Sequence, residues 1–95
     1  MGRVSQAPDE AAVEAKALSA LATNEKTLGP DHPTVAAGCS NLGLFYYYCE
    51  RLPEAKPLME RALAIFTAAL GPEHPDTKNA AQGLDMVEQA SRVLT

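Results

Sequence analysis

Apolar residues recur every three or four positions through four stretches of the chain, and glycine or proline separates each stretch from the next. This spacing gathers the apolar side chains on one face of a helix. The pattern predicts four helices, at about residues 9–28, 33–51, 53–70 and 75–93. No stretch convincingly shows the period-two alternation that would indicate a strand. We therefore expect an all-α domain over residues 9–95, preceded by a flexible N-terminus at residues 1–8.

Glycine and proline mark the ends of these helices. Gly29-Pro30 and Gly71-Pro72 each end a helix, because glycine accepts the left-handed conformation of a helix terminus and proline cannot continue the helix. Pro33 and Pro75 suit the first position of the next helix, where a backbone N–H would have no partner within the helix. These signals predict the same kind of linker at two places in the chain.

Two features of the predicted helices concern how they pack. The first helix carries an apolar face made of Ala12, Val13, Ala17, Ala20, Leu21 and Leu28. Gly43 lies inside the second helix, where glycine costs up to about 1 kcal/mol relative to alanine. We therefore expect another helix to approach closely at Gly43.

A six-residue segment occurs twice. The segment Leu28-Gly29-Pro30-Asp31-His32-Pro33 returns 42 residues later as Leu70-Gly71-Pro72-Glu73-His74-Pro75, with one conservative change. A fixed period in this range indicates a stack of similar helical units, each extended by its neighbour, and such stacks bind other molecules and rarely catalyse. Because His32 and His74 are copied together with the linker, we expect them to shape it rather than to coordinate zinc.

The residues around this repeat resemble a known family. They are Asn41-Leu42-Gly43-Leu44-Phe45-Tyr46 in the second helix, Arg51 with Glu54-Ala55 at the turn, Pro57-Leu58 with Arg61-Ala62-Leu63-Ala64-Ile65 in the third helix, and the linker Leu70–Pro75. Together they resemble the longer, 42-residue variety of tetratricopeptide repeat, the kind found in kinesin light chains and in many bacterial repeat proteins. The resemblance implies a solenoid of four antiparallel helices in a right-handed α-α superhelix.

The chain departs from the family pattern at four positions, one of which is Leu52, where the family often has an aromatic residue. Glu50 stands at the turn where the family often has glycine, and we expect the turn to survive this change. In the last unit, Gly83 replaces the asparagine seen at Asn41, and Asp85 replaces Gly43. The fourth helix is therefore a degraded copy of the second.

The resemblance also assigns a binding surface, because in this family the first helix of each pair lines the concave side of the stack. The partner-binding positions that it implies are Ser40, Asn41, Leu44, Tyr47, Tyr48, Asn79, Gln82 and Met86. The Asn41 amide offers both a donor and an acceptor to the backbone of an extended peptide. Tyr47 and Tyr48 supply rigid aromatic contact area with a hydroxyl group. Tyr46, at the core aromatic position of the family, should instead pack between helices.

Composition limits the partners and the location. With 12 acidic and 8 basic side chains, the net charge is −4, which disfavours nucleic acid and anionic membranes and favours a basic or neutral protein partner. No apolar run approaches the roughly 20 residues of a membrane span, and residues 1–10 lack an apolar signal-peptide core. We expect a soluble, cytoplasmic protein in which Cys39 and Cys49 are free thiols.

The sequence therefore favours a protein-interaction module that binds a peptide segment or a helix of another protein in a concave groove. It shows no phosphate-binding loop, metal-ligand spacing or assigned nucleophile, so we expect no enzymatic activity, cofactor or metal. By phase, the chain holds one whole repeat flanked by two half repeats, whereas about three repeats are usual for a stable stack. This shortfall leaves two alternatives: a homodimer or other assembly formed through the terminal helices, or a fragment of a longer array.

Overall fold

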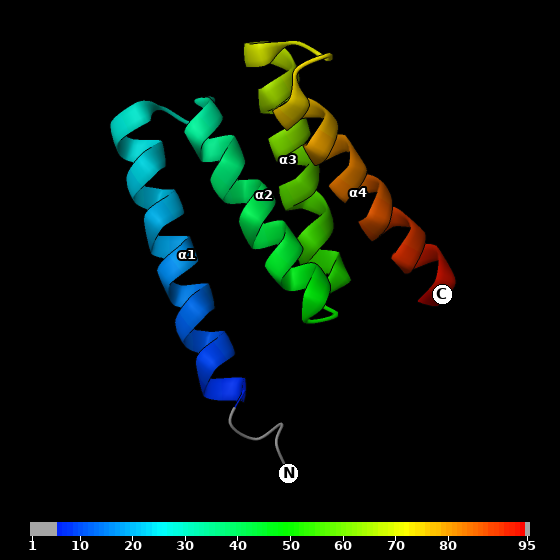
Figure 1. Cartoon of the computed structure of the whole chain (residues 1–95). Coiled ribbons are helices and arrows are strands. Elements are labelled where there is room, and N and C mark those ends of the chain that lie inside the picture. The colour runs from blue at the N-terminus through cyan, green and yellow to red at the C-terminus, as the bar shows by residue number, and fades with distance from the viewer. Residues whose placement is uncertain (1–5, 95) are drawn as a thin grey trace.

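The structure, a computed structural model, describes residues 6–94, and four α-helices account for most of them. The helices are α1 (Gln6–Leu28), α2 (Pro33–Tyr48), α3 (Leu52–Leu70) and α4 (Pro75–Leu94). Consecutive helices run in opposite directions and are joined by short connections, as Figure 1 shows. No strand occurs between residues 6 and 94, so the all-α helical-repeat prediction is confirmed.

The helix bounds differ slightly from the sequence prediction. The first helix begins at Gln6, so residues 6–8 of the expected flexible N-terminus are helical, whereas residues 1–5 lie outside the described part of the chain. The second helix ends at Tyr48, three residues before the predicted end at Arg51. The difference arises because a tight turn occupies residues 49–51.

This turn is a helix-terminating motif with two backbone hydrogen bonds. The Arg51 N–H donates to the Tyr46 carbonyl oxygen (2.8 Å), and the Glu50 N–H donates to the Tyr47 carbonyl oxygen (3.0 Å). This motif requires a left-handed backbone conformation at the position of Glu50, where helices usually have glycine. Here Glu50 adopts it, with φ of 62°, so the turn keeps its form without the glycine of the family pattern.

The two linkers have the same construction. Gly29 (φ 97°) and Gly71 (φ 90°) end α1 and α3 in conformations with positive φ, which glycine adopts without steric cost. His32 Nδ1 then accepts a hydrogen bond from the Thr34 N–H (3.0 Å). The repeated histidine is thus a helix cap, as the sequence predicted for a residue that shapes the linker.

The matching bond at the second linker runs from the Asp76 N–H to His74 Nδ1, again at 3.0 Å. Among residues 6–94 no group of three or more histidine, cysteine or acidic side chains is arranged to hold a metal ion.

Met59 is the centre of the packing between α2, α3 and α4. It is fully buried. A Cβ atom on Gly43 of α2 would lie 2.6 Å from the Met59 sulfur, and a Cβ atom on Gly83 of α4 would overlap the Met59 methyl group. Two glycines on neighbouring helices therefore make room for one methionine, which confirms the close approach expected at Gly43.

The apolar face predicted for α1 is mostly exposed. Only Leu21 of this face is buried (8% exposed), whereas Val13 and Leu28 are 49% and 44% exposed. Leu21 packs at Gly38 of α2, where its Cδ1 atom lies 3.4 Å from the position of a Cβ atom. Because α1 lies at one end of the stack, beside α2, much of its surface has no described helix against it (Figure 1).

Candidate functional site

Helices α2 and α4 lie next to each other and run in the same direction (Figure 1). Two hollows are lined mainly by residues of these helices. The N-terminal hollow has a volume of about 380 Å³ and is lined by Ala37, Ser40, Asn41, Leu44, Phe66, Asp76 and Asn79. The C-terminal hollow has a volume of about 590 Å³ and is lined by Tyr47, Tyr48, Glu50, Leu52, Met86, Gln89, Ala90 and Val93. We call the two hollows together the α2–α4 groove.

Seven of the eight residues predicted to bind a partner line this groove. Ser40, Asn41, Leu44 and Asn79 line the N-terminal hollow, and Tyr47, Tyr48 and Met86 line the C-terminal hollow. Gln82 lines neither hollow and is exposed on α4.

The sequence interpretation missed several lining residues, among them the exposed residues Glu50, Asp76 and Val93. Asp76 lies three residues before Asn79 and Val93 lies seven residues after Met86, so both continue the predicted face of α4. That helical spacing was the signal that could have found them. Glu50 has no such signal, because it lies in the turn after α2 rather than on a helix.

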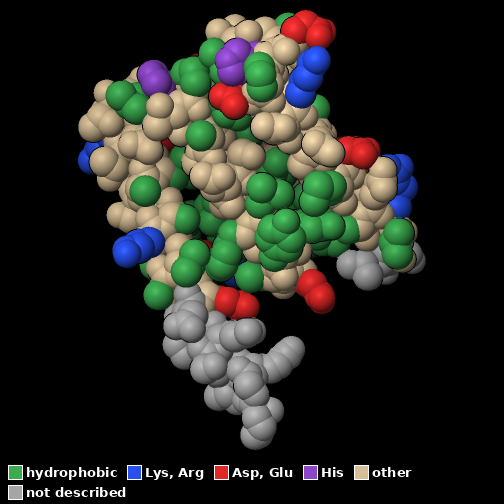
Figure 2. Space-filling view, in the orientation of Figure 1, with side chains coloured by type: hydrophobic (Ala, Val, Ile, Leu, Met, Phe, Trp, Pro, Cys, Tyr) green, Lys and Arg blue, Asp and Glu red, His purple; other side chains and the backbone are tan. Residues whose placement is uncertain are grey.

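The C-terminal hollow exposes apolar and aromatic side chains. Tyr48 is 73% exposed and Val93 is 82% exposed. The rings of Tyr47 and Tyr48 meet edge to face, with centroids 5.3 Å apart and planes at 73°, which limits the freedom of the exposed ring. Figure 2 shows a cluster of hydrophobic side chains over this part of the molecule, with acidic side chains along its lower border.

Leu44 and Gly83 meet between the two helices. Leu44 is half-buried, and its Cδ2 atom lies 3.9 Å from the position that a Cβ atom on Gly83 would take. Gly83 itself is buried against Met59, so the asparagine that the repeat pattern places here would have no room. Packing against Met59 therefore explains why α4 has Gly83 in place of the asparagine of the repeat pattern. As a result, Asn41 has no counterpart across the groove.

Carboxylates are the charged groups of the groove. Glu50 lines the C-terminal hollow and Asp76 lines the N-terminal hollow, and none of the described residues that line either hollow is a lysine or an arginine.

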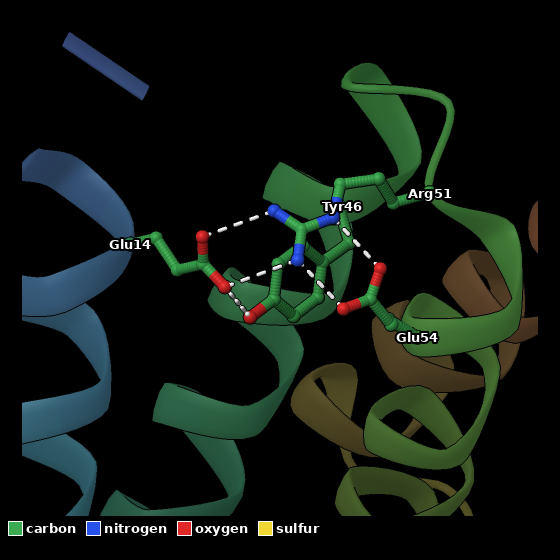
Figure 3. Close-up of polar contacts among 4 residues, drawn as sticks. All are labelled: Glu14, Tyr46, Arg51 and Glu54. Carbon is green, nitrogen blue, oxygen red and sulfur yellow. Dashed lines mark hydrogen bonds and ion pairs between the residues drawn. The ribbon is translucent and has the colours of Figure 1, made fainter. Parts of the chain in front are cut away.

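The guanidinium nearest to Glu50 in sequence, that of Arg51, binds other carboxylates (Figure 3). Its Nη1 and Nη2 atoms donate to the two Glu14 oxygens at 3.0 and 3.2 Å, and its Nε and Nη2 atoms donate to the two Glu54 oxygens at 2.7 and 2.6 Å. The same guanidinium lies 4.4 Å from the centre of the Tyr46 ring. Arg51 thus connects α1 to the turn before α3, and no pattern in the sequence indicated its bond to Glu14.

This cluster shifts the pKa values of its members. The hydrogen bonds from Arg51, and then from the Tyr46 hydroxyl (2.5 Å), lower the pKa of Glu14. Arg51 also lowers the pKa of Glu54. Burial, together with the bond to Glu14, raises the pKa of Tyr46 to about 12, and the bonds to Glu54 and Glu14 raise the pKa of Arg51. The carboxylates and the guanidinium therefore stay charged at neutral pH while the phenol stays neutral.

A second ion pair fixes the other end of α1. Arg61 of α3 contacts a Glu25 oxygen at 2.6 Å and donates to the Pro30 carbonyl oxygen at 3.2 Å. Cys39 is fully buried near this pair, and burial raises the pKa of its thiol. Cys39 and Cys49 are free cysteines, as the sequence predicted.

The lining of the groove offers both hydrogen-bonding and apolar groups. It combines the Asn41 and Asn79 amides with an apolar surface at Tyr48 and Val93. A model of the tetratricopeptide repeat family matches residues 35–76, which run from the first turn of α2 to the first turn of α4. Residues 35–76 are a tetratricopeptide repeat.

The match spans one 42-residue unit, in agreement with the longer variety of tetratricopeptide repeat. Tetratricopeptide repeats generally mediate protein–protein interaction and are not a catalytic family. Comparison with curated proteins gave no match. None of the helices in residues 6–94 has the length and apolar character needed to cross a membrane.

Proposed function

We propose that this tetratricopeptide repeat protein binds a segment of another protein in the α2–α4 groove. The observation that carries the proposal is the lining of the groove, where the predicted side chains of the parallel helices α2 and α4 line two hollows, together with Glu50 of the turn and Leu52 and Phe66 of α3. The tetratricopeptide repeat at residues 35–76 supports a protein as the ligand.

In the N-terminal hollow, the amides of Asn41 and Asn79 are exposed and come from facing helices. An amide offers both a donor and an acceptor, so it can pair with an N–H and a C=O of an extended backbone. Ser40 lies beside Asn41 and adds a hydroxyl group. This hollow would hold the main chain of the partner.

In the C-terminal hollow, Tyr48, Met86 and Val93 form an apolar surface that no described part of the chain fully covers. Removing such surface from water favours binding by about 25 cal/mol per Å². Methionine adapts to different apolar side chains, and tyrosine supplies a rigid aromatic face. This hollow would take an apolar side chain of the partner as an anchor.

Photo-crosslinking tests the proposal. A photoreactive phenylalanine analogue replaces Tyr48, and a matched variant carries it at Glu60, an exposed position on α3 outside both hollows. We expect position 48 to trap a partner from cell extract and position 60 to trap none. The trapping at position 48 should fall when Asn41→Ala is added, while circular dichroism stays unchanged. Equal trapping at both positions, or no effect of Asn41→Ala, would exclude the groove as the binding site.

Self-association is a second candidate, and the exposed apolar side chains of α1 favour it. Val13, Leu18 and Leu28 are 49%, 46% and 44% exposed, and α1 has a neighbouring helix on only one side. A second copy, or a further repeat of a longer array, could cover them. Sedimentation at increasing concentration tests the first of these, because a monomer at all micromolar concentrations would exclude it.

A further inference from the structure

We propose that the segment bound in the α2–α4 groove is basic and apolar: an extended stretch with one apolar anchor residue and a lysine or arginine on either side. This inference rests on the proposed function and adds the chemistry of the partner. The carboxylates of Glu50 and Asp76 would receive the two cations, and the surface around Tyr48 and Val93 would receive the anchor.

The charges of the groove carry the first step. Glu50 and Asp76 are exposed, they line different hollows, and none of the described lining residues is a lysine or an arginine. Arg51, next to Glu50, does not offset them, because it is bound by both Glu14 and Glu54. Together Glu14 and Glu54 carry two negative charges, which outweigh the single positive charge of Arg51. An approaching cation is therefore attracted at both ends of the groove, and an approaching carboxylate is repelled.

The position of the two carboxylates carries the second step. Asp76 lies in the first turn of α4, and Glu50 follows the last turn of α2. With 16 residues, α2 is about 24 Å long at 1.5 Å per residue. An extended chain covers that length with about seven residues at roughly 3.3 Å each. The two cations of the partner should therefore lie about seven residues apart.

The apolar surface carries the third step. The hollow at the Glu50 end is the larger of the two, and it exposes Tyr48 and Val93. The anchor residue should therefore lie close to one of the two cations rather than midway between them. Figure 2 shows acidic side chains at the border of the hydrophobic cluster, so a cation beside the apolar anchor residue would meet negative charge there.

Fluorescence anisotropy with three matched peptide sets tests the inference. Each ten-residue peptide contains serine and glycine, with lysine at its second and ninth positions and one phenylalanine placed in turn at each position between them. The other two sets carry glutamine or glutamate in place of both lysines. We expect the best lysine peptide to bind roughly two- to five-fold tighter per cation than its glutamine counterpart, in the range of exposed ion pairs. The glutamate peptide should bind most weakly.

Variants then locate the effect. Glu50→Gln and Asp76→Asn should each reduce the preference for lysine over glutamine, and together they should abolish it. Glu60→Gln removes an exposed carboxylate of α3 outside both hollows and should leave the preference unchanged. The preference should also weaken as salt rises, because exposed charges are screened.

The outcomes separate this inference from the proposed function. Equal binding of all three sets that is lost with Tyr48→Ala overturns the basic partner and leaves the groove as the binding site. A lysine preference that persists in the Glu50→Gln, Asp76→Asn double variant overturns it as well, because general attraction to an acidic protein then explains it. Absence of binding by every peptide also overturns it, while the crosslinking experiment at position 48 still decides the proposed function.

Discussion

Met59 of α3 packs so closely on Gly43 of α2 that a Cβ atom at position 43 would lie 2.6 Å from the methionine sulfur. The Met59 Cγ atom and the Ala55 carbonyl oxygen lie 3.1 and 3.4 Å from the same point. Position 43 therefore cannot gain a methyl group unless the buried Met59 side chain shifts or α2 and α3 move apart. At Gly83 of α4, in contrast, the obstructing atom is the Met59 methyl group, which rotates away more easily.

We predict that Gly43→Ala destabilises the fold by about 1–2 kcal/mol, since overpacking of roughly 1–3 kcal/mol is partly offset by the better helix propensity of alanine. Gly83→Ala should change the free energy of unfolding by less than half as much. Urea unfolding of both variants measures the difference. Equal effects would show that the sulfur contact does not limit the spacing of α2 and α3.

A second prediction concerns Thr77, which is 3% exposed and has no hydrogen-bond partner for its hydroxyl group within the described residues. It lies 42 residues after Val35, the fully buried residue at the same place in the repeat. A buried, unpaired hydroxyl costs about 1–3 kcal/mol. Thr77→Val should therefore raise stability by about 1 kcal/mol in urea unfolding. The control is Thr67→Val, which removes a hydroxyl bonded to the Leu63 carbonyl oxygen and should give no gain.

A third prediction concerns the left-handed conformation of Glu50 (φ 62°). This conformation costs a residue with a Cβ atom about 1–2 kcal/mol, and glycine gives back part of that through greater freedom in the unfolded chain. Glu50→Gly should stabilise the fold by about 0.5–1 kcal/mol, whereas Glu50→Gln should not. If Glu50→Gly also reduces the preference for lysine peptides, the chain keeps a strained turn to place a carboxylate at the groove. A stability gain without that loss would remove this explanation.

The fourth prediction concerns acid. Because Arg51 lowers the pKa of Glu14 and of Glu54 in the folded protein, the folded state binds fewer protons than the unfolded state. The stability from these pairs is present above the ordinary carboxylate pKa of 4.5 and is lost as the pH falls through the lower, folded values. Urea midpoints measured between neutral and acidic pH should fall less steeply for Glu14→Gln than for the wild type. Parallel curves would argue against the pair as a source of stability.

The sequence predicted those parts of the fold that depend on short stretches of chain. Glycine and proline set the helix ends, and the copied hexapeptide predicted two equal linkers with a shared role for His32 and His74. Helical phase within the repeat was enough to place seven of the eight predicted residues in the lining of the groove, although their role in binding stays a proposal.

The contacts of α1 could not be predicted in this way. Apolar spacing gave no sign of the contacts of Glu14 with Arg51 and of Glu25 with Arg61, both across more than 30 residues of sequence. Which side of α1 faces α2 depends on these distant partners, and exposed glutamates are too common to signal them. The sequence did not predict the Glu50 carboxylate in the groove for a related reason, because Glu50 lies in the turn after α2 and not on a helix face.

The two linkers also bear on how the chain could be extended. Each combines a positive-φ glycine with a histidine that caps the next helix, so the path changes direction in the same manner at residues 29–33 and 71–75. The hexapeptide therefore turns the chain in the same way at both places where it occurs. Further copies of the 42-residue unit joined at this linker should lengthen the superhelix at constant pitch, because each added unit would repeat the geometry of the one before it.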